Sequence, residues 1–103
     1  MTPCPKPQKP ERGTAACKAH MDKVAQLPCM ICGARPVVVH HCICGRYSQS
    51  KMSDFDTIPL CFLHHDATSP LGIHASKSAW VKRYGQPDTA YLPEVRRLIE
   101  EVA

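Results

Sequence analysis

Two short motifs in this chain place pairs of metal-binding side chains at matching spacings. The first pair is Cys29 and Cys32, the second is Cys61 and His64, and two residues separate the members of each pair. Such spacing lets both members turn toward one ion, and two pairs complete the tetrahedron of a structural Zn²⁺ site. The alternative interpretation is two buried thiol pairs with a surface histidine. A zinc ion held there would contribute folding free energy and, with four protein ligands, would leave no open position for catalysis.

The size of the chain makes a metal site important for stability. Its 103 residues, of which only 6% are aromatic, fit one small domain with a modest core. The start has no apolar run typical of a secretory signal, and the sequence has no apolar stretch long enough to span a bilayer. We therefore expect a cytoplasmic protein with reduced thiols, in which cysteine clusters bind metal. The formal net charge of +4 is compatible with a polyanionic partner.

The sequence divides into a basic arm and one domain. Residues 1–13 include four prolines among basic side chains, which predicts a disordered arm, and the domain covers 14–103. Periodicity and breakers predict helices over 14–26, from 62 onward, over 76–84 and over 89–102, with short strands over 36–40 and 56–61. The predicted fold is α+β: a small zinc-stabilised core over 28–75 followed by C-terminal helices over 76–103.

Four further histidines lie near the predicted zinc ligands in the sequence. Successive side chains of a strand face opposite sides, so His40 and His41 point in different directions. His65 projects away from its helical neighbour His64 and cannot share the same ion. If zinc brings the strand end and the helix together, His40, His41, His65 and His74 form a second cluster of imidazoles beside the zinc site, which we interpret as a catalytic metal site. The alternative is that these are ordinary surface histidines.

The order of these motifs resembles that of the HNH (ββα-metal) endonucleases. The CxxC pair, a strand that ends in His-His, a polar loop, IPLCxxHH and a Gly-Ile-His-Ala segment are similar to the phage recombination-enhancement nucleases of the Ref type, over residues 18–85. This resemblance implies a ββα-metal core and a metal-dependent DNA endonuclease that acts in phage or prophage recombination or DNA processing. It also implies a location in the cytoplasm of a bacterial host, and it raises a recombinase–DNA filament as a partner.

The resemblance implies roles for individual residues. His41 stands at the position of the family's general base, and Asp56 at the middle position, usually asparagine, that braces the loop and orients the base. His40, His65 and His74 stand at positions that bind the catalytic divalent ion. Histidine ligands suit transition metals or zinc, whereas the family commonly works with Mg²⁺ or Mn²⁺. The identity of the catalytic ion therefore stays open. His74 follows His65 by nine residues, so the loop between them has to bring it back.

Phosphodiester hydrolysis suits these residue types. A histidine can accept a proton from water near neutral pH, and a divalent ion can hold a phosphate oxygen and the departing 3′-oxygen. Basic side chains between the two strands and in the helix over 76–84 are expected to bind DNA phosphates with little sequence readout. They are Arg46, Lys51, Lys77, Lys82 and Arg83. The competing hypothesis is a non-catalytic zinc-ribbon module that binds DNA or a protein.

Overall fold

The protein has a two-stranded antiparallel sheet at its centre, with helices before and after it. The computed structural model describes residues 11–44 and 52–102. The strands are β1 (Val38–His41) and β2 (Thr57–Leu60). Helix α1 (Ala15–Val24) precedes them, and α2 (Phe62–His65), α3 (Lys77–Tyr84), the 3-10 turn η1 (Asp88–Tyr91) and α4 (Leu92–Val102) follow. The fold is therefore small and α+β, as predicted.

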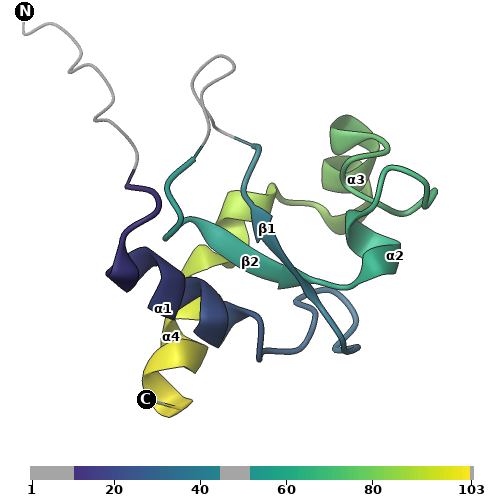
Figure 1. Ribbon diagram of the computed structural model, residues 1–103. Helices are drawn as coiled ribbons and strands as arrows, with labels where there is room; N and C mark the ends of the chain where they lie inside the picture. The colour runs from purple at the N-terminus through teal and green to yellow at the C-terminus, as the bar shows by residue number, and fades with distance from the viewer. Residues whose placement is uncertain (1–10, 45–51, 103) are drawn as a thin grey trace, which may run out of the picture.

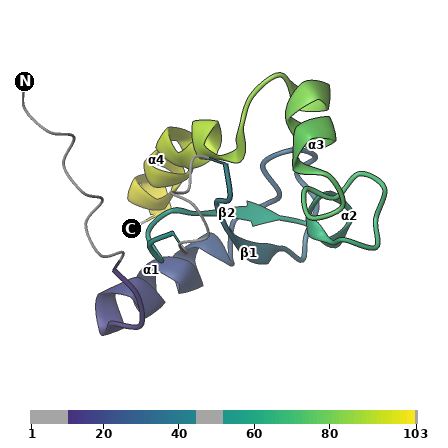
Figure 2. The ribbon, with the colours of Figure 1, turned by 90° about the horizontal axis from the view of Figure 1, so that it is seen from above.

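The helices gather at the two ends of the hairpin. Figures 1 and 2 show α1 and α4 together at one end, and α2 and α3 at the other. One buried core joins the two groups of helices to the sheet, and it includes Val24 of α1, Ile58 of β2, Trp80 of α3 and Val95 of α4. Because both groups pack on the same hairpin, the ends of β1 and the start of α2 hold fixed relative positions.

The helices α1 and α3 begin at the polar residues that the sequence indicates. The Thr14 hydroxyl accepts the Cys17 N–H at 3.1 Å, and the Ser76 hydroxyl accepts the Ala79 N–H at 3.2 Å, as N-cap residues do. Gly85 ends α3 with a φ of 76°, a left-handed conformation that glycine adopts without strain. The first helix stops at Val24, slightly before the predicted boundary, because the chain then tightens into a turn.

The first strand is shifted along the chain relative to the prediction of 36–40. Pro36 has no N–H to donate to a ladder, and pairing starts only with Val38 opposite Leu60. It then continues to His41 opposite Thr57. Both histidines therefore belong to β1, where His40 is buried and His41 is half-buried. This matches the expected alternation of the two side chains.

The last helix begins differently from the prediction of 89–102. The chain first forms the 3-10 turn Asp88–Tyr91, and the regular helix α4 starts at Leu92. Pro93 is tolerated there because N–H groups in the first turn of a helix have no intrahelical acceptor. The turn matters for the site because Asp88 points inward and is completely buried.

The end of the predicted arm is attached to the domain. The carbonyl oxygen of Glu11 accepts the Asp54 N–H at 2.8 Å and the Ser53 hydroxyl at 3.2 Å. The Gly13 N–H donates to the Asp54 carboxylate at 2.8 Å. Residues 11–13 are thus held against the loop before β2, while residues 1–10 of the predicted arm lie outside the described residues.

Candidate functional site

The three cysteines and the histidine of the predicted zinc site come together. Cys32 Sγ lies 3.6 Å from Cys61 Sγ, and His64 Nδ1 lies 3.2 Å from Cys61 Sγ and 3.8 Å from Cys29 Sγ. Tetrahedral zinc, with Zn–S near 2.3 Å and Zn–N near 2.0 Å, requires edges of about 3.8 Å between sulfurs and about 3.5 Å between sulfur and nitrogen. Because the distances fit, this Cys₃His cluster could hold a metal ion such as zinc.

Local hydrogen bonds fix the turn that carries the first two cysteines. The Gly33 N–H donates to the Cys29 carbonyl oxygen at 2.8 Å, and Gly33 has a φ of 75°, which closes the turn in a conformation suited to glycine. The Met30 N–H donates to the Pro59 carbonyl oxygen at 3.0 Å and so joins the turn to β2. The cysteine pair is therefore positioned by the sheet itself.

The second pair of ligands lies at the start of α2. Cys61 is the N-cap residue, and His64 follows one turn later on the same side of the helix. Burial, together with the nearby positive charge of Arg83, lowers the pKa of His64, which favours the neutral imidazole that binds metal. Burial opposes the charged form of Cys29, but backbone N–H groups, that of Cys61 foremost, outweigh it and lower the pKa of Cys29. Both effects favour metal binding.

A second cluster contains the three histidines that the sequence analysis grouped. One ring nitrogen each of His40, His65 and His74 lies within 4.8 Å of the other two. The ring centroids are 5.1 Å apart for His40 and His65, 5.2 Å for His40 and His74, and 4.6 Å for His65 and His74. Burial, then the two neighbouring imidazoles, lowers the pKa of His65 to about 4, so its ring is neutral at pH 7. Three imidazoles in this arrangement could hold one divalent ion.

The loop after α2 brings His74 back to the cluster. The His74 N–H donates to the His65 carbonyl oxygen at 3.3 Å, which places the two residues side by side. Gly72 makes this return possible, because a Cβ at that position would lie 1.9 Å from the Asp66 carbonyl oxygen. The separation of nine residues is thus spanned by a loop that has room only for glycine at position 72.

A buried carboxylate that the sequence analysis missed holds His40. His40 Nε2 lies 2.9 Å from Asp88 Oδ2, and the two side chains are only 1% and 0% exposed. Asp88 also accepts the backbone N–H groups of Ile43 at 2.7 Å and Cys44 at 3.1 Å. Within the described chain His40 Nδ1 is buried without a hydrogen-bond partner. That nitrogen is the one left to bind an ion. No motif marks Asp88 in the sequence, since it follows a proline in an ordinary turn.

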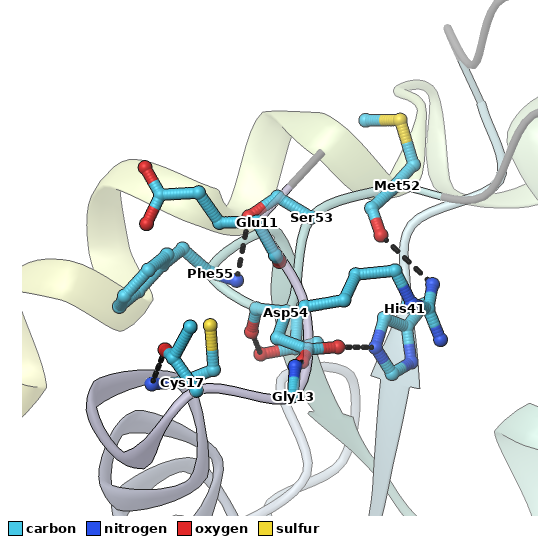
Figure 3. A network of polar contacts seen from close by, with 11 residues as sticks. Glu11, Gly13, Cys17, His41, Met52, Ser53, Asp54 and Phe55 are labelled. Atoms are coloured by element: carbon cyan, nitrogen blue, oxygen red, sulfur yellow. Dashed lines mark hydrogen bonds and ion pairs between the residues drawn. The ribbon is translucent and has the colours of Figure 1, made fainter. Parts of the chain in front are cut away.

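His41 is paired with Asp54 rather than with Asp56. Figure 3 shows His41 directed at Asp54, with His41 Nε2 2.7 Å from Asp54 Oδ1. The hydrogen bond from His41, and then the Gly13 N–H, lower the pKa of Asp54. The ionised carboxylate can only accept a hydrogen bond, which places the proton of a neutral His41 on Nε2 and leaves Nδ1 free to accept a proton. Asp56 instead lies 3.3 Å from Arg96 of α4 in a partly exposed ion pair. The carboxylate that contacts His41 in the structure is therefore Asp54, two residues before Asp56.

One cavity connects the paired His41 to the three-histidine cluster. Its volume is about 290 Å³, and its lining includes His41 and all three histidines of the cluster. Arg12 also lines it and donates one N–H to the Met52 carbonyl oxygen at 3.1 Å. Among the described residues no carboxylate lies within ion-pair distance of Arg12. Imidazoles and a guanidinium around one cavity suit an anionic ligand.

The predicted DNA-binding residues fall into two groups. Lys77, Lys82 and Arg83 are exposed along α3, whose Trp80 is buried in the core. Arg46 and Lys51 lie outside the described residues. The basic side chains of α3 are thus available to a ligand, and Arg83 lies close enough to His64 to lower its pKa.

Comparison with known proteins gives one match. The family model of DUF968, described as a protein of unknown function, matches residues 3–95. The chain belongs to the DUF968 family. The range matched by DUF968 includes both clusters, Asp54 and Asp88. No curated protein and no solved structure matches the chain. In the described part of this DUF968 chain, no helix is long and apolar enough to cross a bilayer.

Proposed function

We propose that this DUF968 chain is a metal-dependent DNA endonuclease with an HNH (ββα-metal) core that hydrolyses phosphodiester bonds. One observation carries the proposal: His41, held by a carboxylate, lines the same cavity as the cluster of three imidazoles. The order β1, β2, α2 supports it, because β1 supplies His40 and His41 and α2 supplies His65, as the resemblance implies. Following the same resemblance, we propose that the enzyme acts in phage or prophage recombination or DNA processing in the bacterial cytoplasm, with a recombinase–DNA filament as a partner.

The two clusters have separate roles in this proposal. The Cys₃His cluster holds a structural Zn²⁺ with no open position, whereas the three-histidine cluster has only three protein ligands and faces a cavity. Imidazole ligands fit Mn²⁺ or Zn²⁺ better than Mg²⁺, which prefers oxygen. A divalent ion bound by His40, His65 and His74 would stabilise negative charge on a phosphate oxygen and on the departing 3′-oxygen.

His41 is the general base in this proposal. Asp54 holds the ring through Nε2, so that Nδ1 can accept the proton of a water molecule in the cavity. The water oxygen bonds to phosphorus as the bond to the 3′-oxygen breaks, and the proton moves to His41. The charge of Asp54 stabilises the imidazolium that forms, as a carboxylate does behind a catalytic histidine. Asp54 thus takes the orienting role that the resemblance implies for Asp56.

Cationic side chains would hold the DNA on either side of the cavity. Arg12 lines the cavity, and its planar guanidinium can donate two parallel hydrogen bonds to a phosphate. Lys77, Lys82 and Arg83 extend the positive surface along α3. Contacts of this kind bind the backbone of DNA and predict salt-sensitive binding with little preference for sequence.

A plasmid-nicking assay with Mn²⁺ or Mg²⁺ tests the proposal. His41→Ala should lower the rate about 10²- to 10⁴-fold, the usual contribution of a general base. His41→Gln should behave in the same way while keeping an N–H for Asp54, so that a loss of folding does not explain the result. His20→Ala is the matched control, because His20 lies on α1 and does not line the cavity.

The outcomes separate the two functional hypotheses. Cleavage by both His41 variants at the wild-type rate would overturn the mechanism. If the wild-type protein binds DNA but cleaves none with either ion, the non-catalytic zinc-binding module is favoured instead. Loss of cleavage in the His41 variants, with His20→Ala unaffected, supports the endonuclease.

A further inference from the structure

Asp88 lies far from the histidine motifs in the sequence but contacts one of them directly. It is in η1, after α3, and lies 48 positions after His40 in the sequence. Its side chain is 0% exposed and accepts hydrogen bonds from His40, Ile43 and Cys44. A buried carboxylate is costly unless its oxygens are hydrogen-bonded, and here three N–H groups surround it.

These contacts determine which nitrogen of His40 carries a proton. The backbone N–H groups of Ile43 and Cys44 can only donate, so Asp88 acts toward them as an acceptor. An ionised carboxylate accepts from His40 as well, which puts the proton on Nε2. The lone pair is then on Nδ1, the buried atom that lacks a hydrogen-bond partner among the described residues.

We propose that Asp88 is a positioning residue of the three-histidine site: it holds His40 as the Nε2–H tautomer and directs Nδ1 toward His65 and His74. The inference rests on the proposed function in that it takes this cluster to be a divalent-metal site. A carboxylate behind a metal-binding imidazole fixes the ring and increases its basicity, and loss of such a partner typically weakens metal binding about 10- to 100-fold.

The same carboxylate also fixes the chain that leaves β1. Ile43 and Cys44 follow the end of the strand after one intervening residue, and their N–H groups donate to the two carboxylate oxygens of Asp88. Thus η1 braces both a metal ligand and the wall of the cavity that Ile43 lines. The C-terminal part of the fold thereby contributes to a site whose candidate ligands all come from the hairpin, α2 and the following loop.

The test compares Asp88→Asn with a matched core variant. Asparagine keeps the shape of aspartate but has no charge. Its NH₂ group replaces one carboxylate oxygen and must therefore face at least one of the three N–H donors. Val95→Ala is the control, because Val95 is 1% exposed in α4 and does not line the cavity, so its loss weakens the core alone. Mn²⁺ binding is measured by calorimetry on proteins loaded with one equivalent of zinc, which the thiolate-containing cluster takes up first, since Mn²⁺ competes poorly for thiolates. Nitrogen-15 NMR of the same proteins without Mn²⁺ reports the tautomer of His40.

We expect wild-type His40 to be protonated on Nε2, and we expect Asp88→Asn to weaken Mn²⁺ binding about 10- to 100-fold while Val95→Ala binds Mn²⁺ as tightly as wild type. Wild-type His40 protonated on Nδ1, or equal affinities for Mn²⁺ in wild type and Asp88→Asn, overturns the role of Asp88 and leaves the proposed function standing. Equal weakening of Mn²⁺ binding in Asp88→Asn and Val95→Ala also overturns the role of Asp88, since the loss of affinity would then follow from lower stability. A wild-type protein that binds zinc but no second divalent ion overturns the histidine site and, with it, the proposed mechanism.

Discussion

Replacing Cys61 by serine should destabilise the protein strongly, because it removes one of four candidate zinc ligands without harming the local backbone. Cys61 is the N-cap of α2 and has the extended conformation of such residues, with a φ of −71° and a ψ of 167°. Serine is a favoured residue at this position, so Cys61→Ser leaves the start of the helix intact. The change therefore isolates the loss of the ligand.

The expected loss of unfolding free energy follows from the sequence separation of the residues that the ion would link. An ion held by Cys29 and His64 joins residues that are 35 positions apart. By chain entropy alone, a cross-link that closes a loop of this length stabilises a fold by about 4 kcal/mol. The whole apparent free energy of structural zinc binding is about 10–16 kcal/mol, against a typical domain stability of about 5–15 kcal/mol. Loss of the site should thus remove at least about 4 kcal/mol, and up to the entire stability.

Urea unfolding followed by circular dichroism, with a slight excess of zinc, measures this loss. The matched control is Cys42→Ala, because Cys42 is 1% exposed in the core but belongs to neither candidate metal group of the described residues. That variant should lose only about 1–2 kcal/mol and retain its zinc. If Cys61→Ser loses no more stability than Cys42→Ala, the assignment of a structural zinc site is wrong.

Three further predictions concern the cavity and its surroundings. Gly72→Ala should displace His74, because its Cβ would meet a backbone oxygen at 1.9 Å, and calorimetry should show weaker Mn²⁺ binding with zinc retained; unchanged Mn²⁺ affinity would contradict the described loop. Asp54 has a pKa below its ordinary value of 3.8, so its contribution to stability is present above that value and is lost only as the pH falls through the lower folded value. The difference in unfolding free energy between wild type and Asp54→Asn should accordingly not decline from pH 7 to pH 5, and a decline within that range would refute the assignment. Arg12→Gln should weaken binding to a DNA duplex in Ca²⁺ and reduce the salt dependence by about one phosphate contact, whereas Lys18→Gln, on exposed α1, should do neither; equal effects would indicate only a change in net charge.

The parts of the site that the sequence predicts are those with a local signal. The spacing of Cys29, Cys32, Cys61 and His64 depends on two tight turns, and each turn is encoded within a few residues. His40 and His41 alternate because they belong to a strand, which the apolar residues before them indicate. Thr14 and Ser76 likewise mark helix starts by their side-chain chemistry.

The carboxylates that hold the histidines could not be found in the same way. Asp54 precedes β2 by three residues and Asp88 lies in η1, so their partners are 13 and 48 positions away. Their roles depend on how the loop before β2 and the turn before α4 pack on β1, and no spacing rule describes that packing. Asp56 stands at the position to which the HNH resemblance assigns the orienting role, but its carboxylate pairs with Arg96 of α4. A sequence motif indicates the candidate ligands, whereas the carboxylates that contact them are decided by tertiary packing.

The helix α2 has only four residues, yet it contributes neighbouring histidines to both clusters. Under the proposed assignments, a chelator would therefore abolish cleavage in two ways. It would remove the divalent ion from the three-histidine cluster, and by removing zinc it would destabilise the short helix that carries His65. Adding Mn²⁺ alone to a zinc-depleted sample should not restore cleavage. Cleavage should return when zinc is added first and Mn²⁺ second. Cells grown with little zinc would then contain less folded protein, because folding after synthesis would itself depend on zinc.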